Sequence, residues 1–132
     1  MRRLRLRGDF RAARRIQKKL ELKYGILISH KAKIGRNFYI KHPIGVVIGK
    51  GAAIGDNVTV FQNVTIGGKN GEFPKIGNDV TIYANACIVG SVEIGDDTII
   101  GAGAVVTKNI APEVVAVGNP CEEKLKRHLA SA

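Results

Sequence analysis

The sequence has few of the residues that mark disulfide-stapled, zinc-binding or membrane-spanning proteins. Its 132 residues contain only two cysteines, Cys87 and Cys121, which are too few for a disulfide framework and lack the spacing of a zinc site. No apolar run approaches the roughly 20 residues that span a bilayer, and no secretory signal follows the basic N-terminus. We therefore expect a soluble, cytoplasmic protein of one domain that holds no metal.

Aromatic residues are also scarce, at 5% of the chain, whereas positive charge is abundant and unevenly spread. Residues 1–24 hold ten Lys and Arg against Asp9 and Glu21, so about +8 of the formal +10 lies there. Such a segment can pack on the rest of the fold, or contact an anionic membrane surface or an anionic glycan. The lack of aromatic side chains for base stacking argues against nucleic acid as the partner.

This basic segment also has the pattern of an amphipathic helix. Asp9 is a suitable N-cap, and the helix is expected to run to about Leu22. Its polar side is filled by Arg and Lys, and its apolar stripe is expected to pack on the end or side of the remaining fold. The stripe consists of Phe10, Ala13, Ile16 and Leu20.

A repeat of six residues organises most of the chain. Aliphatic residues recur every six positions, and the count is broken by two extra residues at 41–47 and four extra residues at 67–75. A period of six is not helical; it fits a short strand followed by a bend rich in Gly, Asp and Asn. The recurring residues are Ile28, Ile34, Ile40, Ile48, Ile54, Val60, Ile66, Ile76, Ile82, Ile88, Ile94, Ile100 and Val106.

Each six-residue rung is too short to bury its own apolar face, so successive rungs must stack on one another. Three rungs to a coil would build a triangular prism of four to five coils from a mainly β chain. We divide the chain into a basic amphipathic helical segment (1–25), a β-helix domain (26–118) and a C-terminal segment (119–132). In the last, the pattern from about Cys121 to Ala130 predicts a short helix that caps the prism.

The two interruptions of the repeat are where a solenoid can carry function without disturbing its core. His42 lies in the first interruption, beside Pro43, whereas His30 and His128 are expected to be surface residues. The second interruption contains the pair Gly67 and Gly68, whose backbone N–H groups suit an anionic or oxyanionic ligand.

Long stretches of this pattern resemble one enzyme family. The segments "KHPIGVVIGKGAAIGDNVTVFQNVTIGG", "PKIGNDVTIYANACIVGSVEIGDDTIIGAGAVVTKNI" and "AVGNP" are similar to the serine acetyltransferase subgroup of the hexapeptide-repeat acyltransferases, over roughly residues 26–122. The resemblance implies a left-handed parallel β-helix that assembles as a homotrimer. It further implies transfer of an acetyl group from acetyl-CoA to a hydroxyl.

The resemblance also implies roles for particular residues. His42 matches the general base, which an imidazole can perform near neutral pH. On composition, and not on the resemblance, Gly67 and Gly68 are our candidates for the oxyanion donor. The acetyl-CoA groove between two subunits would be lined by Gly68, Lys69, Ala84, Ala102 and Lys108.

The sequence departs from the serine-specific pattern at four positions. Leu27 stands where the family has the aspartate that orients the base, and Lys41, Glu72 and Phe73 replace residues expected to bind serine. Because Lys41 and Glu72 would each face a like charge on serine, we expect a different acceptor, most simply a hydroxyl of a sugar or polysaccharide. Serine O-acetylation is the first alternative.

Other functions remain open from the sequence. An acetyltransferase for sugar-nucleotide amines or for an antibiotic hydroxyl would use the same base and donor. A structural or binding solenoid without catalysis is the alternative from a different class. A γ-type carbonic anhydrase shares the β-helix, but it needs three zinc-binding histidines, and His30 and His42 have no third partner at suitable spacing.

Overall fold

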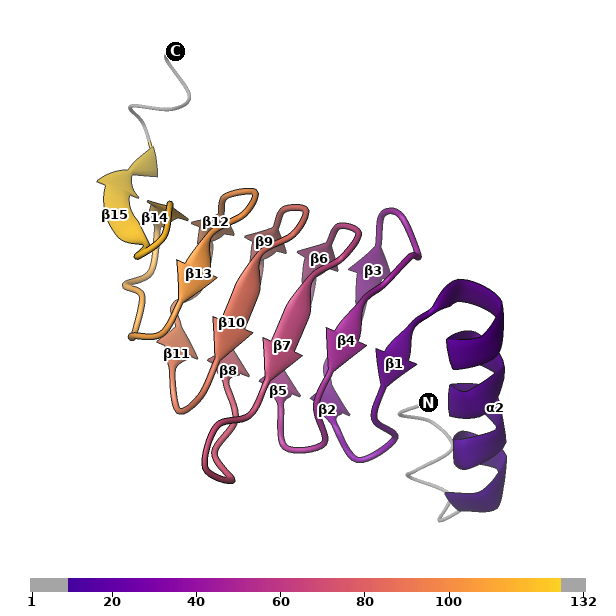
Figure 1. Cartoon of the computed structure of the whole chain (residues 1–132). Coiled ribbons are helices and arrows are strands. Elements are labelled where there is room, and N and C mark those ends of the chain that lie inside the picture. Colours follow the sequence, from indigo (N-terminus) through magenta and orange to yellow (C-terminus); the bar gives the residue numbers. More distant parts are fainter. Residues whose placement is uncertain (1–9, 127–132) are drawn as a thin grey trace.

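The computed structural model describes residues 10–126 and shows a parallel β-solenoid with a helix lying across one end (Figure 1). Three sheets form the walls, and each coil contributes one short strand to each sheet. Sheet A contains β1 (Leu27–Ile28), β4 (Val47–Ile48), β7 (Thr65–Gly67), β10 (Cys87–Val89) and β13 (Val105–Val106). Sheet B contains β2 (Lys33–Ile34), β5 (Ala53–Ile54), β8 (Lys75–Ile76) and β11 (Glu93–Ile94). Sheet C contains β3 (Tyr39–Ile40), β6 (Thr59–Val60), β9 (Thr81–Ile82), β12 (Ile99–Ile100), β14 (Val114–Val117) and β15 (Glu122–Leu125).

The six-residue period predicted from the sequence is the period of these strands. Every predicted aliphatic position lies in a strand, and equivalent residues stack in register, as in the pairs Ile28 with Ile48 and Ile66 with Ile88. The repeat side chains of the middle coils are almost completely buried, including Ile66 and Ile82 at 0% exposure. The alternation of one buried and one outward residue per strand explains why an isoleucine every six positions suffices to build the core.

Helix α2 (Phe10–Tyr24) lies beside β1 and covers the first coil (Figure 1). The predicted apolar stripe is only partly buried: Ala13 is fully buried and Leu20 packs against the core, but Ile16 is 39% exposed. The helix ends in an αL C-cap motif, in which Gly25 adopts a φ of 63° and its N–H donates to the carbonyl of Glu21 at 3.0 Å. The proposed cap Asp9 lies outside the described residues.

The C-terminal helix expected from Cys121 is wrong over residues 122–125. This segment forms β15, which pairs antiparallel with β14, from Val114 with Leu125 to Val117 with Glu122. The edge of β14 offers unpaired N–H and C=O groups, and satisfying them outweighs the helical pattern of the sequence. The rest of the predicted helix, from residue 127, lies outside the described residues.

Between residues 10 and 126, no helix is both long enough and apolar enough to cross a membrane.

Candidate functional site

The turns that join the three sheets form three edges of the prism, and we name each by its contents. The histidine edge follows sheet C and comprises turns 41–46, 61–64, 83–86 and 101–104. The loop edge follows sheet A and comprises turns 29–32, 49–52, 68–74, 90–92 and 107–109. The Asx edge follows sheet B and comprises turns 35–38, 55–58, 77–80, 95–98 and 111–113.

Four of the candidate residues lie together on the histidine edge. Lys41 and His42 open the first turn, and both are exposed. Ala84 and Ala102 lie on the third and fourth turns, where the N–H of Gly103 donates to the carbonyl of Ala84 at 2.9 Å. The candidate base and two of the candidate acetyl-CoA residues therefore follow one line along the prism.

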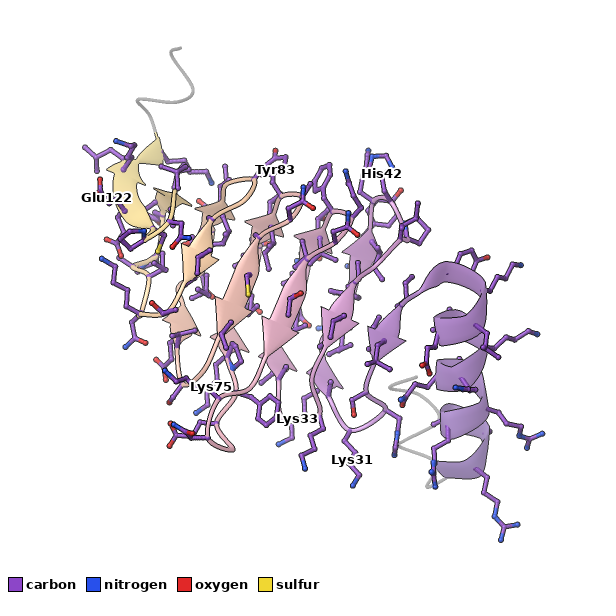
Figure 2. All side chains as sticks on the ribbon, viewed as in Figure 1. Lys31, Lys33, His42, Lys75, Tyr83 and Glu122 are labelled. Carbon is purple, nitrogen blue, oxygen red and sulfur yellow. The ribbon has the colours of Figure 1, made fainter. Side chains whose placement is uncertain are left out.

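An aromatic column stands beside His42 on this edge. The His42 ring meets the Phe61 ring edge-to-face, with centroids 5.9 Å apart and an interplanar angle of 63°. Phe61 in turn stacks on Tyr83 in the next coil, at 4.7 Å and 28°. Figure 2 shows His42 and Tyr83 pointing outward from the same edge. The aromatic column thus covers three successive turns.

The same edge contains a buried polar atom that forms no hydrogen bond among the described residues. This atom is the side-chain oxygen Oε1 of Gln62. An unpaired buried acceptor costs about 1–3 kcal/mol. Such a group needs an explanation, and it lies next to Phe61.

The loop edge carries the remaining candidates, and its longest turn is a tight hairpin. The N–H of Lys69 donates to the carbonyl of Glu72 at 2.9 Å, and the N–H of Glu72 donates back to Lys69 at 3.0 Å. The two central residues, Asn70 and Gly71, have φ angles of 54° and 78°. This is the type I′ turn that an Asn-Gly pair favours, so the four-residue insertion projects as a short, ordered arm.

Phe73 anchors this arm to the prism. A Cβ placed on Gly49, Gly51 or Gly68 would lie 2.6, 2.3 or 2.6 Å from the nearest atom of the Phe73 ring. Only glycine leaves space for the ring at these three positions. Phe73, expected to contact the acceptor, is therefore packed against the glycines of its own chain, while Glu72 is exposed beside it.

The two oxyanion candidates differ in their surroundings. Gly67 lies within β7, in register with Val89 of the neighbouring coil. Gly68 is exposed just after the strand, and its N–H has no acceptor within residues 10–126. Gly68 is therefore the better candidate for a backbone donor to a ligand. Lys108, the last candidate, is exposed on the same edge two coils further on.

One chain does not bring the two groups of candidates together. The strands of sheet A separate the histidine edge from the loop edge, and Figure 1 shows the turn after β3 and the loop after β7 at opposite sides of the prism. Proton transfer needs heavy atoms within about 3 Å of each other. His42 and Gly68 of the same chain lie on different edges, and one chain does not bring them together.

None of the candidate residues lies on the Asx edge, where polar side chains bond to the next coil. The carboxylate or amide oxygens of Asp56, Asn78 and Asp96 accept the backbone N–H groups of Arg36, Asp56 and Asn78 at 2.7–2.8 Å. Asn57 and Asp79, on this edge, adopt φ angles of 57°, which Asn and Asp tolerate better than other side chains. The Asx edge is occupied by structural hydrogen bonds.

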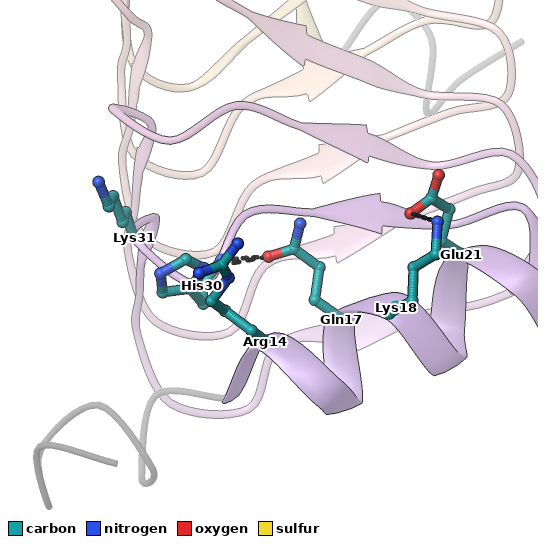
Figure 3. Close-up of a pocket in the computed structure, with 6 residues that line it drawn as sticks. All are labelled: Arg14, Gln17, Lys18, Glu21, His30 and Lys31. Atoms are coloured by element: carbon teal, nitrogen blue, oxygen red, sulfur yellow. Dashed lines mark hydrogen bonds and ion pairs between the residues drawn. The ribbon is translucent and has the colours of Figure 1, made fainter. Parts of the chain in front are cut away.

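A basic cleft lies between α2 and the first turn of the loop edge (Figure 3). It has a volume of about 830 Å³ and is lined by Arg14, Gln17, Lys18, Glu21, His30 and Lys31. Oε1 of Gln17 lies 3.1 Å from both the backbone nitrogen and Nδ1 of His30, which fixes the helix to the turn. Glu21, the one acidic group of this lining, lies 3.4 Å from Lys18. The cleft is therefore electropositive.

Some residues of the site were not recognised from the sequence. Phe61 and Tyr83 have the same place in the repeat as Lys41, the first residue after the strands of sheet C, but aromatic residues there are outside the usual pattern. Gly49 and Gly51, which accommodate Phe73, are indistinguishable in the sequence from ordinary turn glycines. No group of three or more His, Cys, Asp or Glu side chains that could hold a metal ion occurs in the part of the chain that the structure describes.

Comparisons with known proteins identify similar sequences. Residues 73–108 match the family model described as bacterial transferase hexapeptide (six repeats). The serine acetyltransferase of Bacillus pumilus is 46% identical over 100 residues, which cover 73% of this chain and 46% of that protein. Mitochondrial serine acetyltransferase 3 of Arabidopsis thaliana is 40% identical over 109 residues, covering 80% of this chain and 28% of that protein.

Solved structures give the same result. The serine acetyltransferase of Neisseria gonorrhoeae has a TM-score of 0.85 and 35% identity, covering 93% of this chain and 49% of that one. Soybean serine acetyltransferase complexed with serine has a TM-score of 0.83 and 34% identity, covering 92% and 51%. A serine acetyltransferase in complex with CoA has a TM-score of 0.85 and 30% identity, covering 93% and 52%.

The chain belongs to the hexapeptide-repeat acyltransferase superfamily, and its fold is the left-handed parallel β-helix expected of that class. Within the superfamily it is serine acetyltransferase-like in both sequence and structure. It spans about half the length, or less, of the relatives that it matches.

Proposed function

We propose that the protein is an acetyl-CoA-dependent O-acetyltransferase and that its acceptor is L-serine. The observation that carries the proposal is the fit of nearly the whole chain to serine acetyltransferases, including one complexed with serine and one with CoA. The exposed His42 supplies a base, the turns beside it carry the small residues Ala84 and Ala102, and the exposed Gly68 supplies a backbone N–H.

The relatives and structures reported above favour serine over the sugar hydroxyl expected from the sequence, and the polysaccharide reading is not supported. That reading rested on the charges of Lys41 and Glu72. Both side chains are exposed, and neither is held by an ion pair within the described residues. A long exposed side chain can turn its charge into water, so a like charge on serine is not a fixed obstacle.

In the proposed reaction, His42 takes the proton of the serine hydroxyl as its oxygen attacks the thioester carbonyl of acetyl-CoA. The carbonyl oxygen becomes an oxyanion, for which the N–H of Gly68 is the candidate donor. The tetrahedral intermediate then collapses and expels the CoA thiolate. The proton on His42 passes to that sulfur, so the histidine returns to its neutral form.

The proposed site needs two copies of the chain. In a homotrimer, the histidine edge of one copy would face the loop edge of the next. His42, Ala84 and Ala102 would then lie on one wall of the groove and Gly68, Lys69 and Lys108 on the other. Lysine ammonium groups suit the phosphates of CoA as point charges. A protein that stays monomeric at assay concentration would contradict this arrangement.

The basic cleft and helix α2 suggest a second contact, independent of catalysis. Arg11, Arg14, Arg15 and Lys18 line an adjoining hollow of about 420 Å³ on the same helix. We expect this surface to bind an anionic membrane or glycan by charge attraction. Sedimentation with vesicles that contain anionic lipid should therefore decrease steeply as salt is raised, and neutral vesicles should not bind. The cytoplasmic location stays a prediction.

Acetyl transfer can be tested directly with the purified chain. CoA release from acetyl-CoA is measured with L-serine, with L-threonine and with a panel of neutral sugars, and the products are identified by mass spectrometry. We expect O-acetylserine to form fastest. The proposal fails if sugars are acetylated and serine is not. It also fails if L-serine does not raise CoA release above the rate measured without an acceptor.

A further inference from the structure

The aromatic column gives His42 a partner of a kind that the sequence did not predict. The resemblance to serine acetyltransferases implies an aspartate where this chain has Leu27, so the candidate base lacks the carboxylate expected to orient it. Leu27 is 42% exposed and its side chain carries no polar atom. Something else must hold the imidazole if it is to accept a proton in a fixed direction.

We infer that Phe61, supported by Tyr83, is the positioning residue for His42. Edge-to-face aromatic pairs prefer ring centroids 4.5–7 Å apart, and the 5.9 Å between His42 and Phe61 falls within that range. A ring at this distance restricts rotation of the imidazole about its side-chain bonds. It does so without a hydrogen bond, so both ring nitrogens stay available for substrate and product.

The Phe61 ring is itself held by the next coil. Stacking on Tyr83 at 4.7 Å keeps the Phe61 ring in place.

The column depends on the first interruption of the repeat. The backbone N–H groups of Lys41, Phe61 and Tyr83 each donate to the next coil, so these three residues are in register. His42 follows Lys41 by one residue, and the two inserted residues widen the turn around it. The insertion therefore lets the imidazole contact the Phe61 ring. The two inserted residues and the aromatic column together position His42.

The experiment compares Phe61→Leu with Phe61→Tyr, because the first removes the aromatic ring and the second keeps it. We expect Phe61→Leu to lower kcat about 3- to 10-fold with little change in KM for acetyl-CoA, and Phe61→Tyr to retain most of the activity. Tyr83→Leu should have the same direction and a smaller effect. Tyr39→Leu is the matched control, because Tyr39 is 55% exposed on sheet C and outside the column.

A second readout does not depend on catalysis. In protein with labelled histidines, the His42 ring proton signals, assigned from their loss in His42→Ala, should show the ring-current shift of a neighbouring aromatic face. Phe61→Leu should remove that shift, and Phe61→Tyr and Tyr39→Leu should keep it.

The kinetic arm rests on the proposed function, and the two readouts separate the possible failures. If the parent protein shows no ring-current shift at His42, the column does not hold the ring and the inference is wrong, whatever the activity. If the shift is lost in Phe61→Leu while kcat is unchanged, the contact exists but does not position the base, which also overturns it. If His42→Ala is fully active, the assignment of the base fails, and with it the role inferred for Phe61.

Discussion

The histidine edge and the Asx edge are built on the same repeat, but their side chains do different work. On the Asx edge, Asp56, Asn78 and Asp96 turn back onto the backbone of the adjacent coil and accept its N–H groups. On the histidine edge, the His42 ring meets Phe61 edge-to-face, and Phe61 stacks on Tyr83. The turn geometry leaves one edge fully committed to structure and the other able to carry chemistry.

The difference shows how a repeat protein can divide stability from function. The core is the same under both edges, since the buried isoleucines and valines continue through every coil. The turn residues decide whether the side chains of an edge hydrogen-bond to the backbone of the adjacent coil or stay available to contact a ligand. Substitutions on the two edges should therefore change different measurements.

The largest effect is expected at the base. His42→Ala should lower acetyl transfer by about 100-fold or more, because the acceptor hydroxyl loses its proton acceptor, while CoA binding and the melting temperature change little. Steady-state kinetics and CoA titration measure the two quantities. His30→Ala is the matched control, since His30 contacts Gln17 at the helix and lies away from the histidine edge. Full turnover in His42→Ala would refute the assignment of the base.

A smaller effect is expected on the loop edge. Gly68→Ala would place a Cβ 2.6 Å from the Phe73 ring, so the ring and the hairpin arm must move. Because displaced binding groups weaken a precisely aligned site, we expect kcat/KM for acetyl-CoA to fall about 10-fold. Gly67→Ala should lose less, since its Cβ would meet only Thr65 at 3.7 Å. Equal losses in the two variants would show that the Phe73 contact is not what matters.

Substitutions on the Asx edge should change the free energy of unfolding and leave the catalytic rate unchanged. Asn78→Ala removes the acceptor for the N–H of Asp56, which is 2.8 Å away, and should lower the free energy of unfolding by about 1 kcal/mol. Chemical denaturation measures this change, and kcat per folded molecule should stay the same. A loss of kcat without a loss of stability would erase the distinction between the two edges.

The smallest effect is expected at the surface ion pair of the Asx edge. Lys126 lies 2.6 Å from Asp97, but their side chains are 36% and 53% exposed. Exposed pairs contribute about 0–1 kcal/mol, and salt screens them. Lys126→Ala should therefore shift the melting temperature by little, and less at high salt than at low salt. A large shift would mean that Lys126 holds β15 in place.

The sequence could predict the coils because the signal is repeated in every rung. Each isoleucine position reports the same kind of environment, so the two interruptions of the repeat do not hide the pattern. The helix α2 was also predictable from its charge and apolar spacing, to within two residues of its C-terminal end at Tyr24. The strand β15 was not, because its pairing depends on the free edge of β14, which lies elsewhere in the chain.

The candidate site divides in the same way. His42 and Gly68 stand out in the sequence because they lie in the two interruptions of the repeat. The contact of His42 with Phe61 does not, because it joins residues of different coils, and only the stacking of those coils brings them together. The packing of Phe73 against Gly49, Gly51 and Gly68 could not be predicted for the same reason.

The two ends of the prism have a consequence for assembly. A coil of parallel strands can accept another coil at either end, so an unprotected solenoid could join end to end into filaments. Here α2 covers the first coil, and β15 closes sheet C with a strand of opposite direction. The reversed polarity of β15 does not match the hydrogen-bonding pattern that a further parallel coil would need. Growth along sheet C is thus opposed by one strand of four residues, while association through the sides remains open.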